Sequence, residues 1–217
     1  MRSWILHAEK GFFVVNKPAG VLSQKDKSGE DDLAGLLKKD LEKKGEKVPF
    51  LAPVHRLDRN TSGLLILARS AEAAAQLTDW LQKGEIRKTY LAIVKGDPGE
   101  SGRYDFPLWK DERKNQSFVK PGGDEALTEF KRLQKMGSSS LMEVNIITGR
   151  SHQIRAHFAH AGHALIGDRK YGKKPWSEIF SRPALHAYRL EIPPGLKVEC
   201  SLPEDMRDLL KKLGGKV

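Results

Sequence analysis

The sequence predicts an α+β fold in which a mixed, mostly antiparallel central sheet is flanked by helices and loops. Strand-like apolar runs outnumber helical segments along the 217 residues, and short, hairpin-like connections join them. The regular alternation of strand and helix that marks a doubly wound fold is missing. A chain of this length can bury one large core or two small ones, and we expect a single domain over residues 1–217.

In the first half of the chain, apolar spacing and turn residues mark five elements. We expect strands at residues 11–18, 64–67 and 88–94, and helices at residues 33–41 and 71–83. Pro18 closes the first strand, because proline has no amide hydrogen for a strand ladder. Asp31 or Asp32 can cap the first helix, and Ser70 can cap the second. Gly84 then ends the second helix.

The second half opens with a long excursion at residues 97–123. This stretch is rich in glycine, proline and charge, and we expect one short strand in it, at Phe118-Val119. An excursion of this length is usually functional or mobile. After it we expect strands at residues 128–134, 141–148, 184–192 and 197–202, and helices at residues 152–161 and 204–213.

The charge balance indicates a polyanionic partner. Lysine and arginine number 38 against 28 acidic residues, which gives a formal net charge of +10 and a pI near 9.6. Such a balance favours phosphate-rich partners through counterion release. Basic proteins are also common for other reasons, so charge alone leaves nucleic-acid binding open.

Composition also bears on the compartment. No apolar run approaches the ~18 residues that a membrane-spanning helix needs, and Glu9 interrupts the N-terminus before a signal-peptide core could form. The single cysteine, Cys200, excludes an intrachain disulfide and suits a reducing compartment. We therefore expect a cytoplasmic protein without a membrane partner.

We expect neither a nucleotide cofactor nor a metal. The chain contains no Gly-x-Gly-x-x-Gly and no Gly-x-x-x-x-Gly-Lys-[Ser/Thr] string, so loops that cradle a nucleotide have no support. His152, His157, His160 and His163 could suggest zinc, but their spacing matches no standard ligand pattern and only one cysteine exists. Polar, capping or nucleic-acid-facing roles explain these histidines better.

The segment at residues 55–63, His-Arg-Leu-Asp-Arg-Asn-Thr-Ser-Gly, is the most informative. It places Asp58 between Arg56 and Arg59, directly before the buried strand at residues 64–67. An aspartate before a turn is most often a structural Asx-turn residue. Two flanking cations are more than such a turn requires. A carboxylate at the mouth of a strand, ringed by cations, can instead face a polyanionic substrate.

Three further segments carry candidate residues, and each has a simpler structural explanation. Tyr90 lies in Arg-Lys-Thr-Tyr-Leu-Ala-Ile-Val-Lys-Gly, where it could be a core residue or could lie against a bound base. Arg155 lies in Thr-Gly-Arg-Ser-His-Gln-Ile-Arg-Ala-His, about one helical step from the apolar face, so it could reach a pocket at the edge of the core. Leu185 lies in Arg-Pro-Ala-Leu-His-Ala, which alone indicates only the start of a strand.

Taken together and in this order, the segments resemble the RluA family of RNA pseudouridine synthases. The matching strings are His-Arg-Leu-Asp-x-x-Thr-Ser-Gly, Lys-Thr-Tyr-Leu-Ala, Gly-Arg-x-His-Gln-Ile-Arg and Leu-His-Ala. Asn-Lys-Pro-Ala-Gly at residues 16–20 and Gly-Asp-Arg-Lys-Tyr-Gly at residues 167–172 fit the family too. The resemblance runs from about Phe12 to Leu202, and several matches in one order are more specific than any single motif.

The resemblance implies a pseudouridine synthase fold and one catalytic domain over residues 1–217, without a separate S4 RNA-binding domain. It also implies that uridine in RNA is isomerised to pseudouridine without a cofactor or metal. Asp58 would be the nucleophile, and it would attack the sugar or the base according to which proposed mechanism operates.

The resemblance also implies roles for three other residues. Arg155 would contact and orient the Asp58 carboxylate, because burial disfavours a carboxylate charge and a contacting guanidinium offsets that cost. At ~4 Å and an effective dielectric near 20, such a pair gains about 4 kcal/mol before desolvation is subtracted. Tyr90 would stack on the uracil and could take the C5 proton. Leu185 would pack beneath the pocket.

The remaining arginines are candidates for RNA contacts. A uridine held in a stem is out of reach unless it is flipped from the stack. Arg56 is placed to fill the vacated space or to hold a phosphate, and Arg59 and Arg150 are further candidates for phosphate contacts. RNA recognition would then rest on shape, splayed bases and backbone contacts.

Two other functions fit parts of the sequence. A catalytically inactive RNA-binding protein on the same fold would bind RNA without forming product, although a binder has no need for a carboxylate among phosphates. A hydrolase could use His55 and Asp58, with or without a metal, but the two do not form a nucleophile–base–orienter set. The target stays open between ribosomal and transfer RNA stem-loops. We expect a monomer that needs no protein partner.

Overall fold

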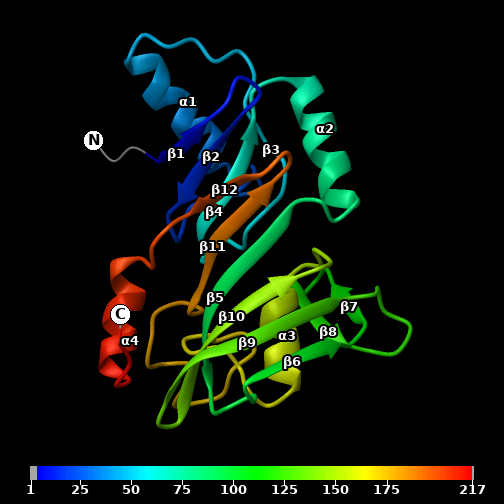
Figure 1. The fold of residues 1–217 in the computed structure, drawn as a ribbon, viewed down its shortest axis with the longest axis vertical. Helices are drawn as coiled ribbons and strands as arrows, with labels where there is room; N and C mark the ends of the chain where they lie inside the picture. Colours follow the sequence, from blue (N-terminus) through cyan, green and yellow to red (C-terminus); the bar gives the residue numbers. More distant parts are fainter. Residues whose placement is uncertain (1–3, 217) are drawn as a thin grey trace. The chain divides into compact units, whose positions relative to one another are not determined.

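The computed structural model describes residues 4–216, which form two compact units (Figure 1). Unit 1 comprises the chain up to Arg87 together with Ala187–Cys200, and unit 2 comprises Lys88–His186 together with the residues from Ser201 onward. The prediction of one catalytic domain over residues 1–217 stays a prediction. Within the described residues, none of the helices is long and apolar enough to span a membrane.

Unit 1 is built on hydrogen-bonded strands grouped around the strand that follows the Asp58 segment. The order is β1 (Ile5–Ala8), β2 (Phe12–Lys17), β4 (Ser62–Ala68) and β11 (Leu185–Ile192), of which Ala187–Ile192 belongs to this unit. The short β3 (Ala52–Pro53) pairs with β4, and β12 (Leu196–Glu199) pairs with β11. The β1–β2, β2–β4, β3–β4 and β11–β12 pairings are antiparallel. Every residue of β4 is buried, as its apolar run predicts.

Two helices complete unit 1, and both begin at predicted caps. Asp32 caps α1 (Leu33–Lys43) by accepting a hydrogen bond from the Gly35 amide, and Ser70 caps α2 (Ala71–Gln82) by accepting one from the Ala73 amide. Each cap satisfies one of the amides that a helix start leaves unpaired. α2 packs against β4, and together with β11 and β12 they enclose a core of aliphatic side chains and Cys200.

Unit 2 contains four antiparallel strands and a separate hairpin. The strand order is β5 (Arg87–Lys95, of which Lys88–Lys95 belongs to this unit), β10 (Ser139–Ile146), β9 (Leu127–Met136) and β6 (Ser101–Asp105), and the hairpin is β7 (Leu108–Asp111) with β8 (Gln116–Val119). α3 (Gln153–His160) packs against β8 and β9. α4 (Glu204–Lys212) is tied to the loop before β11 by a two-point ion pair between Arg182 and Asp205.

The predicted class, α+β with a mostly antiparallel sheet, is confirmed, and the predicted helices and main strands are present. The prediction for residues 97–123 was wrong in detail, because this stretch holds three strands rather than one. β6 hides its character because it is polar and contains Gly102, where a Cβ would lie only 2.5 Å from the Phe130 ring. β1 was also not predicted, since its four residues show a weak alternation and stand beside charged neighbours.

Candidate active site

In unit 1, Asp58 lies in a turn directly before β4, as the sequence predicts. Its carbonyl oxygen accepts a hydrogen bond from the Thr61 amide at 2.9 Å, and the residue is half-buried. The preceding residue, Leu57, is buried and fixed on both sides by Ser23, whose hydroxyl accepts from the Leu57 amide at 3.0 Å and donates to its carbonyl at 2.8 Å. The backbone that carries the carboxylate is therefore held on both flanks.

The fully buried Lys17 also fixes the backbone of the Asp58 turn. Its ammonium donates to the carbonyl oxygens of Pro18, Val21 and Arg59 at 3.1, 2.8 and 2.9 Å. Burying a cation is costly unless its donors are satisfied. Lys17 meets that requirement because its ammonium binds carbonyl oxygens of both the loop after β2 and the turn around Asp58. Its position in the Asn-Lys-Pro-Ala-Gly string gives this family-like segment a structural purpose.

Glycine is required at the end of the Asp58 segment. Gly63 has a φ of +113°, and a Cβ there would lie 2.2 Å from the carbonyl oxygen of Ala187 on β11. A side chain at this position would both strain the backbone and push β11 away. The Thr-Ser-Gly ending of the segment thus lets β4 approach its neighbour closely.

The two arginines beside Asp58 differ in their surroundings. Arg56 is exposed, and within residues 4–216 its guanidinium has no hydrogen-bond or ion-pair partner. Arg59 instead forms a two-point ion pair with Glu30 at 3.0 and 2.6 Å and donates from Nε to the carbonyl of Gly20. Of the two, Arg56 is the cation available to a phosphate without first breaking a protein ion pair.

His55 has a backbone role. Its Nε2 accepts a hydrogen bond from the Ile66 amide of β4 at 3.2 Å. A ring nitrogen that accepts an amide hydrogen is unprotonated, so this nitrogen is occupied as an acceptor. The hydrolase hypothesis, which would use His55 and Asp58, gains no support from this hydrogen bond.

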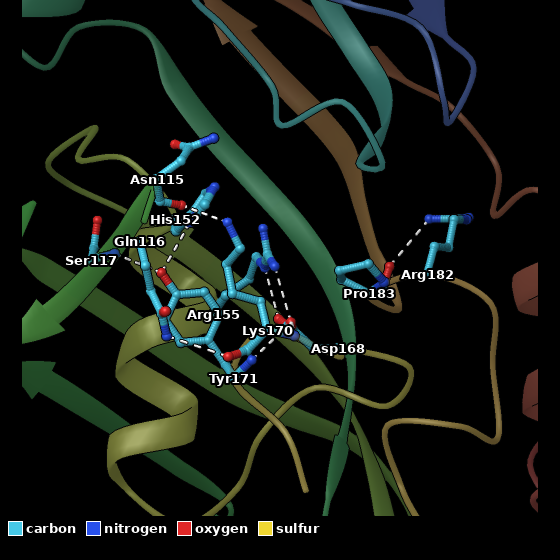
Figure 2. A network of polar contacts seen from close by, with 10 residues as sticks. All are labelled: Asn115, Gln116, Ser117, His152, Arg155, Asp168, Lys170, Tyr171, Arg182 and Pro183. Atoms are coloured by element: carbon cyan, nitrogen blue, oxygen red, sulfur yellow. Dashed lines mark hydrogen bonds and ion pairs between the residues drawn. The ribbon is translucent and has the colours of Figure 1, made fainter. Parts of the chain in front are cut away.

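In unit 2, Arg155 on α3 is held by a buried carboxylate that the sequence analysis did not select. Asp168 accepts from Arg155 Nε at 2.7 Å and from Nη2 at 2.9 Å (Figure 2). The Arg155 side chain is 10% exposed and that of Asp168 is fully buried. Paired donors and acceptors in this fork fix both the position and the plane of the guanidinium. Arg155 therefore enters the site with a preset orientation.

Asp168 is itself held by the turn that follows it. Its Oδ1 accepts hydrogen bonds from the amides of Lys170 and Tyr171 at 3.1 and 3.2 Å. Gly167, just before it, has a φ of +76°, and a Cβ there would lie 2.1 Å from the Arg182 carbonyl oxygen. The Gly-Asp-Arg-Lys-Tyr-Gly string thus forms a turn that fixes the Asp168 carboxylate against Arg155.

Tyr171 connects Arg155 to the hairpin and to the start of α3. The Arg155 guanidinium lies 5.1 Å from the centre of the Tyr171 ring. The Tyr171 hydroxyl accepts from the Ser117 amide at 2.7 Å and is hydrogen-bonded to His152 Nδ1 at 2.9 Å (Figure 2). His152 has a left-handed backbone, with φ of 54°, at the N-terminus of α3. These contacts bind three separate segments of unit 2 around the arginine.

Tyr90 lies on β5, where it is 5% exposed and pairs with Val144 of β10. Lys88, two residues earlier, points to the same face of the strand because side chains alternate. The Lys88 ammonium lies 3.7 Å from where a Cβ on Gly149 would be, and within residues 4–216 it has no hydrogen-bond or ion-pair partner. Burial lowers the pKa of Lys88 below its ordinary value. An anion placed here would compensate that burial.

Gln153 fixes the loop that carries Arg150. Its buried amide oxygen accepts from the Thr148 hydroxyl and the Arg150 amide, and its nitrogen donates to β9. The exposed Arg150 side chain donates to the Glu125 carbonyl at 2.9 Å and lies 3.9 Å from Asp124. Arg150 is thus at the surface, in the same loop as Gly149, which lies beside Lys88.

Leu185 is 5% exposed at the start of β11, and its carbonyl accepts from the Arg182 guanidinium at 3.2 Å. Arg182 also binds Asp205 on α4 at 2.7 and 2.9 Å. The Arg-Pro-Ala-Leu-His-Ala string therefore contains the start of a strand, as its simpler explanation predicts. The functional role of Leu185 stays a prediction.

The histidines of α3 take structural positions. His157 is fully buried between the Thr128 hydroxyl and the Phe106 carbonyl, at 3.0 and 2.9 Å. Burial lowers its pKa below 6.5, and the neighbouring His160 adds to that effect. Within residues 4–216, no group of three or more histidine, cysteine, aspartate or glutamate residues could hold a metal ion.

The structure thus groups the predicted residues by unit. Unit 1 brings Arg56, Asp58 and Arg59 together in one loop, and unit 2 carries Tyr90, Arg150, Arg155 and Leu185. Sequence reasoning missed the supporting residues Lys17, Lys88 and Asp168. All three stood in strings noted for their family resemblance, but nothing in those strings indicated which role each residue has.

Comparison with known proteins gives one consistent result. The family model described as RNA pseudouridylate synthase matches residues 11–160. An uncharacterized RNA pseudouridine synthase of Chloroflexus aurantiacus is 44% identical over 140 residues, which are 64% of this chain and 44% of that protein. The uncharacterized RNA pseudouridine synthase YhcT of Bacillus subtilis is 35% identical over 95% of this chain and 71% of its own length. The ribosomal large subunit pseudouridine synthase D of Yersinia pestis is 30% identical over 96% of this chain and 70% of its own length.

Solved structures agree with these relatives. The human RNA pseudouridylate synthase domain containing 4 superimposes with a TM-score of 0.80 at 26% identity, over 97% of this chain and 92% of that one. The human domain containing 1 protein superimposes with a TM-score of 0.75 at 23% identity, which indicates the shared fold. The predicted pseudouridine synthase fold is confirmed.

Proposed function

Because the chain belongs to the RNA pseudouridylate synthase family, we propose that it isomerises uridine in structured RNA to pseudouridine with Asp58 as the nucleophile. The observation that carries the proposal is the family match over residues 11–160, which spans the segments of Asp58, Tyr90 and Arg155. The firm backbone of the Asp58 turn is compatible with this role, since a nucleophile must be held at a fixed position.

The reaction needs no redox partner. The Asp58 carboxylate attacks either the sugar C1′ or the uracil ring, and the C1′–N1 glycosidic bond breaks. The retained uracil turns so that C5 bonds to C1′, the C5 proton leaves, N1 gains a proton, and Asp58 is released. Substrate and product have the same atoms, so the protein has only to hold the detached base and move one proton.

Arg155 is proposed to orient the Asp58 carboxylate through its guanidinium. Its own placement supports this role, because Asp168 and the Tyr171 ring fix the plane of the guanidinium within unit 2. A lysine could not present two parallel donors in that plane. Asp168 would be a positioning residue that acts through Arg155.

Tyr90 is proposed to stack on the uracil, and Leu185 to pack beneath the base. Arg56 is proposed to occupy the space that the flipped uridine leaves, or to hold a phosphate, because its guanidinium has no partner in the described chain. Lys88 and Arg150 are proposed as phosphate contacts. Arg59 would have to exchange Glu30 for a phosphate, so its role is the costliest of the set.

The relatives narrow the substrate to be tested first. Several are ribosomal large subunit pseudouridine synthases D, so we propose large-subunit ribosomal RNA ahead of transfer RNA. We further propose that the protein acts in the cytoplasm as a monomer without an obligatory protein partner, in keeping with its charge of +10 and single cysteine.

The direct test compares wild type with Asp58→Asn on large-subunit ribosomal RNA and transfer RNA that lack pseudouridine. Chemical labelling and primer extension would locate any product. We expect product from wild type and none from Asp58→Asn, with the RNA dissociation constant changed by less than a few fold. Asp40→Asn is the matched control and should turn over normally, because Asp40 is a half-buried residue of α1 whose carboxylate pairs with Lys44.

Two outcomes would contradict the proposal. Turnover by Asp58→Asn would overturn the nucleophile assignment. Tight RNA binding by wild type without product on either RNA would instead favour a catalytically inactive RNA-binding protein on this fold.

A further inference from the structure

The β7–β8 hairpin of unit 2 exposes two aromatic side chains side by side. Trp109 of β7 and Phe118 of β8 are direct cross-strand partners, and they are 47% and 36% exposed. Directly opposed strand residues lie close enough for their side chains to touch. The pair therefore forms one apolar patch on the outer face of the hairpin.

The other face of the hairpin explains why this patch is not part of the core. Leu108 and Val119 pack with Ala126 of the neighbouring loop, Ala156 of α3 and Tyr171, and Ser117 is buried on the same side. Side chains alternate along a strand, so Trp109 and Phe118 must face outward. Both rings are therefore accessible from outside the core of unit 2.

Two cations lie on the segment that carries the aromatic pair. The Lys120 ammonium lies 5.2 Å from the centre of the Trp109 ring. Arg113, at the turn of the hairpin, is exposed, and within residues 4–216 its guanidinium has no partner. An aromatic surface with a lysine over one ring and an arginine on the same hairpin suits a ligand that offers flat rings and negative charges together.

The hairpin is fixed to the segment that holds Arg155. The Lys170 ammonium donates to the carbonyl of Lys114 at 3.2 Å. It also donates to the carbonyl of Asn115 at 2.7 Å, and the Tyr171 hydroxyl accepts from the Ser117 amide (Figure 2). The Ser117 hydroxyl also donates to the Ser151 carbonyl before α3 at 2.6 Å. The patch and the Arg155–Asp168 pair therefore belong to one network within unit 2, at a set spacing.

We propose that Trp109 and Phe118 form a platform on which an unpaired base of the substrate RNA stacks, while Lys120 and Arg113 contact its phosphates. This inference rests on the proposed function, since it takes RNA to be the substrate. Charge decides the occupant: a nucleotide supplies both a ring and an anion, whereas an apolar protein surface would leave both cations without compensation. Two side chains also offer far less than the ~1,200 Å² that a stable protein interface buries.

The platform would select RNA in which an unpaired base lies at a fixed distance from the reacting uridine. It would favour a loop or bulge over a continuous duplex, because bases in a duplex are already stacked on one another. Stacking tolerates any base, so the platform would select the shape of the RNA rather than its sequence.

The test uses the full-length protein and a stem-loop RNA that carries the modified uridine. Trp109→Ala and Phe118→Ala should each weaken binding by about 5- to 150-fold, the range measured for loss of one base–aromatic stack. Leu133→Ala, at an equally exposed apolar position on β9 of the same unit, should leave binding unchanged. Trp109→Tyr keeps a stacking ring and should restore most of the affinity.

Fluorescence gives a readout that does not depend on turnover. RNA should quench the emission of wild type, and Trp109→Phe should lose that quenching although three of the four tryptophans remain. Quenching by RNA without any pseudouridine product would support the platform while refuting the proposed function. Normal turnover and affinity in Trp109→Ala would overturn the platform and leave the function intact. Self-association of wild type that Trp109→Ala abolishes, with RNA affinity unchanged, would also overturn it.

Discussion

Replacing Asp168 by asparagine tests whether Arg155 is held by a buried charge. Asparagine keeps the size of the side chain and an oxygen for the Lys170 and Tyr171 amides, but it removes the charge that faces the guanidinium at 2.7 and 2.9 Å. Arg155 would stay buried without this partner. Removing one member of a buried ion pair costs about 3–5 kcal/mol in the free energy of unfolding.

Asp168→Asn should lose more activity than the fraction of unfolded protein accounts for. Without the fork, the guanidinium can rotate about its side chain, and a misplacement of about 1 Å at a reacting group lowers the rate by about 100-fold. We therefore expect the kcat of the folded variant to fall by about that factor while RNA affinity changes little. Urea unfolding gives the stability, and single-turnover product formation on the modified RNA gives the rate.

A second ion pair in unit 2 provides the matched control. Arg182 and Asp205 form the same two-point contact, also at 2.7 and 2.9 Å, but the Asp205 side chain is 43% exposed. The Arg182 guanidinium also donates to the Pro183 and Leu185 carbonyls, and water reaches the Asp205 side chain, so Asp205→Asn should cost about 1 kcal/mol and leave kcat unchanged. If Asp168→Asn and Asp205→Asn behave alike in both measurements, the inference that Asp168 positions Arg155 is wrong.

Three further predictions follow from other sites. Tyr90→Phe should keep RNA affinity, and a fall in single-turnover rate would assign proton transfer to the phenol, whereas an unaltered rate would leave only packing or stacking. Lys88→Met should weaken RNA binding and reduce the slope of log K against log salt by about 1. Lys131→Met, at an exposed position of β9, is the control. If the two variants give the same slope, Lys88 makes no specific phosphate contact. For His157, burial lowers the pKa below 6.5, so the unfolded chain binds more protons and stability should fall as pH drops below 6.5. His157→Asn should flatten that urea profile, whereas His7→Asn in unit 1 should not.

The parts of the fold that the sequence predicted are those set by local chemistry. Asp32 and Ser70 mark helix starts because a cap needs only an oxygen near the next few amides. β4 is recognisable because a strand buried on both faces is apolar throughout. The turn at Asp58 lies where the Asn-Thr-Ser-Gly string places it. None of these depends on residues far away in the chain.

The unpredicted parts depend on long-range contacts. A lysine at the end of a strand normally indicates a solvated position, yet Lys17 is fully buried. Its long-range partner is the carbonyl of Arg59, 42 residues later. Asp168 among Arg169, Lys170 and Lys173 reads as one member of a charged surface loop. It is buried because Arg155 on α3 needs a partner, and no local pattern indicates that pairing.

Residues proposed to take part in the reaction differ from the residues that fix them in place. The residues selected from sequence, such as Asp58 and Arg155, belong to compact strings because the chemistry needs particular side chains in a particular order. The residues that fix them, Lys17 and Asp168, are buried ions satisfied by backbone or by a single opposite charge. A buried ion tolerates substitution poorly, because its partner is left with an uncompensated polar group. Mutations at Lys17 should therefore impair both stability and turnover, whereas those at Asp58 should impair turnover alone, and this difference can identify positioning residues before any complex with RNA is solved.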